Sequence, residues 1–346
     1  MDLGMDTAPA SPPRADTAAG GLPRLRAVLA GIGGYLPETV VTNDDLARTV
    51  ETSDAWIRER TGIGQRHIAQ PHETCAFMAT RAAAAALADA GVGADAVDAI
   101  ILATATPDEA FPATALRVQA ALGAGGFGFD LSAACSGFLY ALGVADALVR
   151  AGQARGVLVI GAEVYSRILN WQDRNTCVLF GDGAGAVFLR AATGSGDGRT
   201  ARGILSTHLH ADGRLAEILY VDGAVGQPER SGHLKMQGKE VFRHAVLRLA
   251  EAVEEALAAN DLDRDAIDWL VPHQANLRII ESTRKRLGLA PERVVLTVER
   301  HANTSAASIP LALADAHGRG LLRPGQLVLL EALGGGLTWG SALVRL

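Results

Sequence analysis

The chain has 346 residues, of which 49% are hydrophobic and 20% charged, so it can bury a large core. Its net charge of −6 at pH 7 gives no reason to expect nucleic-acid binding, which usually needs a basic surface. The three cysteines are widely spaced and form no CxxC motif, which argues against a disulfide framework or a structural zinc site. No apolar run approaches the ~18 residues that span a membrane. We therefore expect a cytoplasmic protein without membrane association.

The first 24 residues differ in composition from the rest of the chain. They are rich in Ala, Pro, Gly and Asp, and they have neither the basic start nor the apolar stretch of a secretory signal. We expect residues 1–24 to form a disordered N-terminal extension outside the folded protein, or to reflect an upstream choice of start codon, since Met5 lies close by.

From Leu25 onward, apolar strand-like runs alternate with helical runs. Continuous apolar strands separated by helices predict an α/β protein whose sheets are covered on both faces. The expected strands are 25–31, 99–103, 126–131, 156–161, 184–189, 269–272, 294–298 and 327–330.

The sequence also contains an internal echo. Three pairs of similar segments occur in the same order: 86–100 with 256–270 (offset 170), 132–135 with 305–308 (offset 173), and 185–190 with 340–345 (offset 155). Their shared order predicts a duplicated α/β unit with halves at 25–200 and 201–346. Equivalent loops of the two halves should then meet around a pseudo-twofold centre.

Cys135 lies between a predicted strand and an apolar helical run. A thiol at a helix N-terminus feels the positive end of the helix dipole, so we expect its pKa to be lowered. The small residues around it leave room for a substrate carbonyl. The alternative interpretation is a small buried hydrophobic residue, as we expect for Cys75 and Cys177.

Three further features are candidates for the same site. His273 ends an apolar strand, where functional loops are usually built, although a single His is more often structural. Asn303, in the sequence HANTSAAS, could otherwise serve only as a turn or helix cap. The glycines at 334–336 permit close backbone approach to a ligand, or simply a tight turn. A phosphate-binding loop is disfavoured because no GxGxxG motif or P-loop lysine is present.

Together these motifs resemble beta-ketoacyl-ACP synthase III, the initiating condensing enzyme of bacterial fatty-acid synthesis. The resemblance runs from about Val28 to Leu346 and rests on SAACSGF, PHQAN, HANTSAAS, GDGAGA and GGGLTWGSALVR. It implies a thiolase-like fold, in which duplicated α/β halves form α-β-α-β-α layers, and a homodimer.

The resemblance also implies a mechanism. Cys135 would take an acyl group from acyl-CoA, with the backbone N–H groups of Cys135 and Gly335 holding the oxyanion. Malonyl-ACP would then lose CO2, and His273 and Asn303 would stabilise the resulting enolate. This chemistry calls for no cofactor and no metal.

By the same resemblance, further residues are assigned to substrate binding. Each of them has an ordinary alternative as surface charge, half-buried aromatic or core side chain. The assignments are Trp56, Arg60, Arg174 and Asn276 to CoA, Arg243, Arg278 and Arg284 to acyl carrier protein, and Phe111 (from the neighbouring subunit) and Leu333 to the acyl pocket.

Several alternatives remain open at this point. Leu333 and Leu337 stand where some relatives carry Phe, so the primer is not fixed. A starter-unit ketosynthase or acyltransferase of a secondary pathway would use the same three residues. A cysteine hydrolase is another alternative, but it would need water at the acyl-enzyme. A catalytically inactive homologue would only bind acyl-CoA or ACP.

Overall fold

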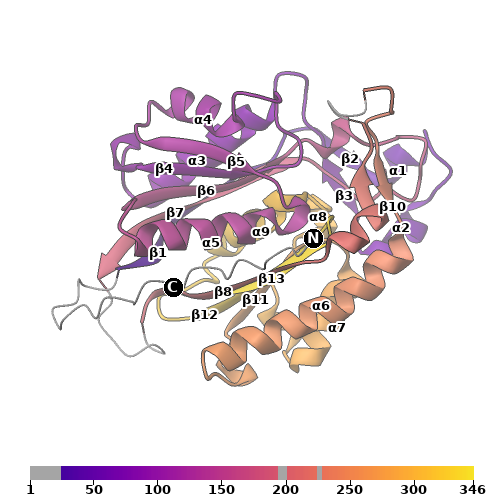
Figure 1. Ribbon diagram of the computed structural model, residues 1–346. Coiled ribbons are helices and arrows are strands. Elements are labelled where there is room, and N and C mark those ends of the chain that lie inside the picture. Colours follow the sequence, from indigo (N-terminus) through magenta and orange to yellow (C-terminus); the bar gives the residue numbers. More distant parts are fainter. Residues whose placement is uncertain (1–24, 194–200, 224–227) are drawn as a thin grey trace, which may run out of the picture.

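The computed structural model describes residues 25–193, 201–223 and 228–346 (Figure 1). Residues 1–24, predicted to form an extension, lie outside the described residues. Figure 1 shows two stacked sheets with helices between them and on both outer faces. This is the α-β-α-β-α layering expected of a thiolase-like fold.

The first sheet is built from residues before 194. Its strands, in spatial order, are β1 (Leu25–Tyr35), β7 (Gly183–Thr193), β6 (Gly156–Glu163), β4 (Ala99–Ala103) and β5 (Phe127–Leu131). Every residue of β4 and of β6 is buried, as expected for strands covered on both faces.

The second sheet is built from residues after 202. Its strands, in spatial order, are β11 (Trp269–Pro272), β12 (Leu327–Gly334), β13 (Thr338–Arg345) and β8 (Gly203–Ala211). Two small ribbons accompany the sheets: β2 (Val40–Thr42) with β3 (Gln65–His67), and β9 (Leu219–Val221) with β10 (Leu234–Met236).

The helices complete the layers. The outer helices of the first sheet are α3 (Cys75–Asp89) and α4 (Thr114–Leu122), the central helices are α5 (Gly137–Arg150) and α9 (Ser308–Gly318), and those outside the second sheet are α6 (Gly238–Ala259) and α7 (Leu277–Leu287). Short helices and 3-10 turns connect these elements: α1 (Asn43–Leu46), α2 (Asp54–Thr61), α8 (Val298–His301), η1 (Ala94–Ala96), η2 (Ala134–Ser136), η3 (Tyr165–Arg167), η4 (Gly213–Ile218), η5 (Arg264–Ala266), η6 (Pro291–Arg293) and η7 (Ser305–Ala307).

The two sheets repeat one topology, which confirms the predicted duplication. In the first, β4 pairs parallel with β6, and β6 and β1 pair antiparallel with β7. In the second, β11 pairs parallel with β12, and β12 and β8 pair antiparallel with β13. The registers of β4 and β11 keep the predicted offset of 170, since Ala99 pairs with Val157 and Trp269 pairs with Val328.

The structure corrects the predicted alignment of the second pair of similar segments, 132–135 with 305–308. Its two 3-10 turns, η2 and η7, each begin with a non-glycine residue of positive φ: 45° at Ala134 and 48° at Ser305. These two residues are therefore equivalent, with an offset of 171 rather than 173. The counterpart of Cys135 is then Ala306, not Ser308.

The predicted strand at 294–298 is wrong. Val294 makes one isolated parallel bridge to Leu270, and α8 begins at Val298. The Gln274 side chain replaces the missing strand neighbour, since its Oε1 accepts from the N–H groups of Thr297 and Val298 at 2.8 and 3.0 Å. Backbone groups satisfied in this way do not need a full strand pairing.

Glycine at 161 sets how closely the first sheet meets η7. A Cβ placed there would lie 2.2 Å from the Ala306 carbonyl oxygen. Gly161→Ala should therefore lower the free energy of unfolding by about 2 kcal/mol or more, because backbone must move, and should also reduce turnover. Denaturant unfolding of the variant measures the first effect. Gly318→Ala is the control, since a Cβ there meets nothing within 4 Å; equal stability of the two variants would contradict the argument.

Candidate active site

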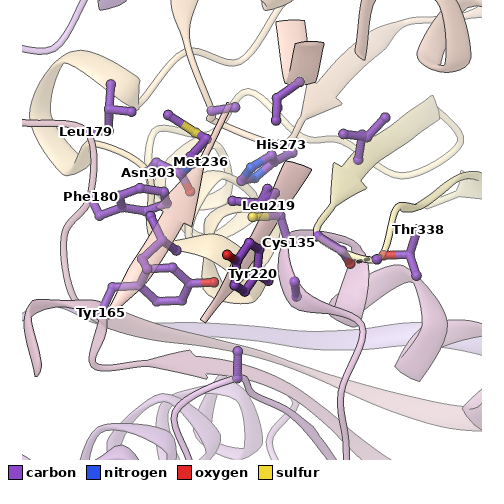
Figure 2. Close-up of a pocket in the computed structure, with 18 of the residues that line it drawn as sticks. Cys135, Tyr165, Leu179, Phe180, Leu219, Tyr220, Met236, His273, Asn303 and Thr338 are labelled. Atoms are coloured by element: carbon purple, nitrogen blue, oxygen red, sulfur yellow. Dashed lines mark hydrogen bonds between the residues drawn. The ribbon is translucent and has the colours of Figure 1, made fainter. Parts of the chain in front are cut away.

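A cavity of about 520 Å³ opens where the two halves meet. Figure 2 shows Cys135, His273 and Asn303 around it, with the Cys135 sulfur directed towards the His273 ring. The three residues come from η2, from the end of β11 and from the loop between α8 and η7. The structure thus brings the three sequence-predicted residues together in one pocket.

Cys135 is buried at the inner end of the pocket. Close approach of β12 positions it, because a Cβ on Gly334 would lie 2.6 Å from the Cys135 nitrogen. The predicted lowering of its pKa is wrong: α5 begins only at Gly137, and burial raises the pKa of the Cys135 thiol to about 12. Charge on the sulfur must therefore be stabilised by neighbouring groups.

His273 is held by a buried serine. Its Nδ1 lies 2.5 Å from Ser308 Oγ, which also accepts a hydrogen bond from the Gln274 N–H at 3.3 Å. We infer that the Ser308 hydroxyl hydrogen is directed to Nδ1, which leaves the ring hydrogen on Nε2. Burial lowers the pKa of His273 to about 3, so the ring is neutral and can donate from Nε2.

Asn303 is oriented by the backbone of η7. Its Oδ1 accepts the Ser305 N–H at 2.8 Å, and its own N–H donates to the Leu179 carbonyl at 2.9 Å. With Oδ1 engaged in this way, the Nδ2 group is the amide donor left for the cavity. His273 and Asn303 therefore present two neutral N–H donors to one space.

The glycines at 334–336 lie next to Cys135 and to the cavity. Gly335 and Gly336 are among the lining residues. A Cβ on Gly335 would lie 2.7 Å from the Leu219 carbonyl oxygen, so this position cannot carry a side chain. Among the described residues, no backbone carbonyl accepts a hydrogen bond from the N–H of Gly335.

The residues predicted to contact CoA form one cluster. Ser53 caps α2 by accepting the Trp56 N–H at 3.2 Å, and the helix places Trp56 and Arg60 one turn apart. The guanidinium carbons of Arg60 and Arg174 lie 4.6 and 5.4 Å from the centre of the Trp56 ring. Asn276 lines the cavity, caps α7 and donates to the Arg60 carbonyl at 3.0 Å.

The residues predicted to contact acyl carrier protein differ in availability. Arg243 and Arg278 are exposed beside Phe242, which lines the cavity, and Arg278 lies 5.5 Å over that ring. Arg284 is held by the Glu281 carboxylate and the Leu289 carbonyl, and only 15% of its side chain is exposed. It is therefore the least available of the three.

Of the residues predicted for the acyl pocket, Leu333 lines the cavity and Phe111 does not. Phe111 is 85% exposed in this chain. The apolar wall also includes residues that the sequence did not single out. They are Tyr165, Leu179, Phe180, Leu219, Tyr220, Val221, Leu234, Met236, Val241, Phe242 and Ile279. They come from scattered elements and share no motif, so no sequence signal marked them.

The described residues show neither a metal site nor a membrane-spanning helix. Within the described residues, no group of three or more His, Cys, Asp or Glu side chains could hold a metal ion. Within the same residues, no helix is long and apolar enough to cross a membrane.

Comparison with known proteins gives consistent results. The chain matches 3-oxoacyl-[acyl-carrier-protein] synthase III over residues 129–213 and the C-terminal region of that family over residues 257–346. It is 68% identical to a beta-ketoacyl-[acyl-carrier-protein] synthase III of Acidiphilium cryptum over 321 residues, 92% of this chain and 99% of the relative.

Solved structures agree. The crystal structure of 3-oxoacyl-[acyl-carrier-protein] synthase III from Aquifex aeolicus superposes with a TM-score of 0.86 at 45% identity, covering 92% of this chain and all of that chain. The priming beta-ketosynthase of the R1128 polyketide pathway superposes with a TM-score of 0.88 at 34% identity, covering 95% and 99% of the two chains.

The fold and these similarities define an acyltransferase of the thiolase-like condensing class. Within that class, the chain belongs to the 3-oxoacyl-[acyl-carrier-protein] synthase III family.

The Ser308 hydroxyl should matter for turnover through the His273 tautomer. Ser308→Ala removes the donor to Nδ1, so we expect the Nε2–H form to lose population and turnover to fall about 10-fold. Nitrogen NMR of the His273 ring measures the tautomer directly. Ser341→Ala is the matched control: this buried serine donates to the Ala252 carbonyl at 2.7 Å, and its loss should cost about 1 kcal/mol of stability without changing turnover. An unchanged tautomer in Ser308→Ala would contradict the assignment.

Proposed function

We propose that this chain condenses an acyl-CoA primer with malonyl-ACP and so initiates fatty-acid synthesis. One observation carries the proposal: a buried thiol and two neutral N–H donors, from Cys135, His273 and Asn303, face one cavity. Membership of the synthase III family supports it.

In the first stage, the Cys135 thiolate attacks the thioester carbonyl of the acyl-CoA, and CoA leaves as its thiolate. The N–H groups of Cys135 and Gly335 receive the oxyanion that forms during attack. Trp56, Arg60, Arg174 and Asn276 bind the CoA portion beside the cavity mouth.

In the second stage, malonyl-ACP enters and loses CO2. The electrons of the broken C–C bond pass into an enolate, and its negative oxygen lies between His273 Nε2 and Asn303 Nδ2. Neutral donors suit this step, because their hydrogen bonds strengthen as negative charge develops on the enolate oxygen. They also do not bind the malonyl carboxylate as a cation would. The enolate carbon attacks the acyl group on Cys135 and releases beta-ketoacyl-ACP. The proposed steps use no cofactor.

The alternatives differ in acceptor and pathway. A starter-unit ketosynthase would share every step above, and the R1128 enzyme is such a relative at 34% identity. The identities of 55–68% to proteins named beta-ketoacyl-[acyl-carrier-protein] synthase III support the fatty-acid pathway over this alternative. We further propose that the protein works in the cytoplasm as a homodimer, with Phe111 reaching the partner's acyl pocket.

A two-stage assay tests the proposal. Cys135→Ala should form no acyl-enzyme by intact mass, because the nucleophile is gone. His273→Ala and Asn303→Ala should still be acylated, while condensation should fall about 100- to 1,000-fold for each, since one enolate donor is lost. Acetyl-, branched and longer acyl-CoAs are supplied as primers. If no primer yields beta-ketoacyl-ACP, the proposal is contradicted. Release of free acid in the absence of malonyl-ACP would indicate a hydrolase.

Docking of the acidic carrier protein should depend on the exposed arginines near Phe242. Arg278→Glu should raise the KM for malonyl-ACP about 10-fold, with little change in the KM for acyl-CoA, and the effect should shrink as salt is added. Arg286→Glu, an exposed charge near the other end of α7, is the control. Equal effects of both changes would indicate a general charge effect rather than a docking site.

A further inference from the structure

A buried carboxyl group lies behind Cys135. Glu163 ends β6 and is fully buried. It accepts hydrogen bonds from Thr106 Oγ at 2.7 Å, Thr104 Oγ at 3.3 Å and the Ala105 N–H at 3.1 Å. All of these donors are neutral, so the carboxyl group is hydrogen-bonded but not neutralised by a cation. Burial raises the pKa of Glu163 to about 7, within reach of proton exchange near neutral pH.

Ser305 lies between this carboxyl group and the thiol. Its φ of 48° is uncommon for serine and fixes its position at the start of η7. Its hydroxyl donates to Tyr165 Oη at 3.1 Å. The start of η7 packs against the end of β6, which carries Glu163, because a Cβ on Gly161 would lie 2.2 Å from the Ala306 carbonyl oxygen. The Ser305 hydroxyl lowers the pKa of both Cys135 and Glu163. To pass a proton on, this hydroxyl must therefore turn from Tyr165 towards Glu163.

His273 does not supply a base for the thiol. Its Nδ1 lies 2.5 Å from Ser308 Oγ, and in the tautomer inferred above its Nε2 carries the ring hydrogen. The buried thiol nevertheless has to lose a proton before or during attack on a thioester. Glu163, reached through Ser305, is the acceptor that the described residues offer next to Cys135.

We propose that Glu163 takes the proton of the Cys135 thiol through the Ser305 hydroxyl during acyl transfer. The S–H bond breaks as Ser305 Oγ gains that hydrogen and gives its own to a Glu163 oxygen. The thiolate electron pair forms the bond to the acyl carbon, and the departing CoA thiolate is protonated by solvent. In the condensation stage, the released Cys135 thiolate takes the proton back from Glu163 by the same route. Each turnover then consumes one solvent proton and releases one CO2.

This inference rests on the acyl-cysteine chemistry proposed above, but its test does not need an acyl donor. Iodoacetamide alkylation reports the reactivity of Cys135 directly, measured against pH and corrected with Cys135→Ser for the other cysteines. Cys75, Cys135 and Tyr165 are the titratable groups that face Glu163. Burial raises the pKa of Cys75 and of Tyr165 well above its usual range, so both stay neutral during the assay.

Glu163→Gln should slow alkylation of Cys135 at pH 7 at least 10-fold and move its rise to higher pH, because the internal proton acceptor is gone. The opposite sign would overturn the proposal: a carboxylate that only repels the thiolate would, when neutralised, leave Cys135 more reactive. An unchanged profile would overturn it as well.

Two more variants keep the test independent of folding. Ser305→Gly removes the hydroxyl while glycine tolerates the positive φ, and it should slow alkylation as Glu163→Gln does. The double variant should be no slower than the slower single, since both residues serve one path; multiplied effects would contradict the relay. Glu331→Gln is the control, because Glu331 is a fully buried carboxyl group in β12 whose neutralisation should leave the profile unchanged.

Acylation by acyl-CoA is measured in parallel by intact mass. If the alkylation results hold and no acyl-CoA reacts, the relay stands and the proposed function fails. If acylation proceeds equally in wild type and Glu163→Gln, the relay fails and the proposed function stands.

Discussion

The site depends on the close packing of two short 3-10 turns, η2 and η7, against strand ends of the two sheets. This contact requires glycine at two positions. A Cβ at Gly334 would lie 2.6 Å from the Cys135 nitrogen, and one at Gly161 would lie 2.2 Å from the Ala306 oxygen. It also requires positive φ at the first residue of each turn. These constraints hold Cys135 and Asn303 at fixed positions.

Burial then determines the chemistry of the side chains that the packing encloses. The same desolvation raises the pKa of Cys135 and lowers that of His273, so the thiol and the imidazole are both neutral. A neutral imidazole donates to an enolate but does not bind the malonyl carboxylate as a cation would. The same burial makes the Cys135 thiol hard to ionise. A group beside the sulfur must therefore accept its proton.

Internal repetition predicted the duplicated α/β fold, and the motifs that resemble the synthase III family singled out Cys135, His273 and Asn303, which the structure brings to one cavity. The prediction failed at 294–298, which was expected to be a strand. There the Gln274 side chain, rather than a neighbouring strand, accepts the hydrogen bonds of two backbone N–H groups. Repetition and motifs also failed for Glu163 and Ser305, whose importance comes from burial and proximity rather than from a motif. The thiol pKa was predicted in the wrong direction because sequence shows a helix start but not the desolvation around it.

The duplication explains why the site is asymmetric although the fold is not. By strand register, Glu163 at the end of β6 is equivalent to Gly334 at the end of β12. Each of these strand ends lies against the turn of the other half, so the two equivalent positions face one centre. The first half places a carboxyl group there, and the second leaves space for the backbone of Cys135. Where Cys135 stands in the first turn, the second carries Ala306. The same contact thus holds the proposed nucleophile in one half and supplies its proposed proton acceptor in the other.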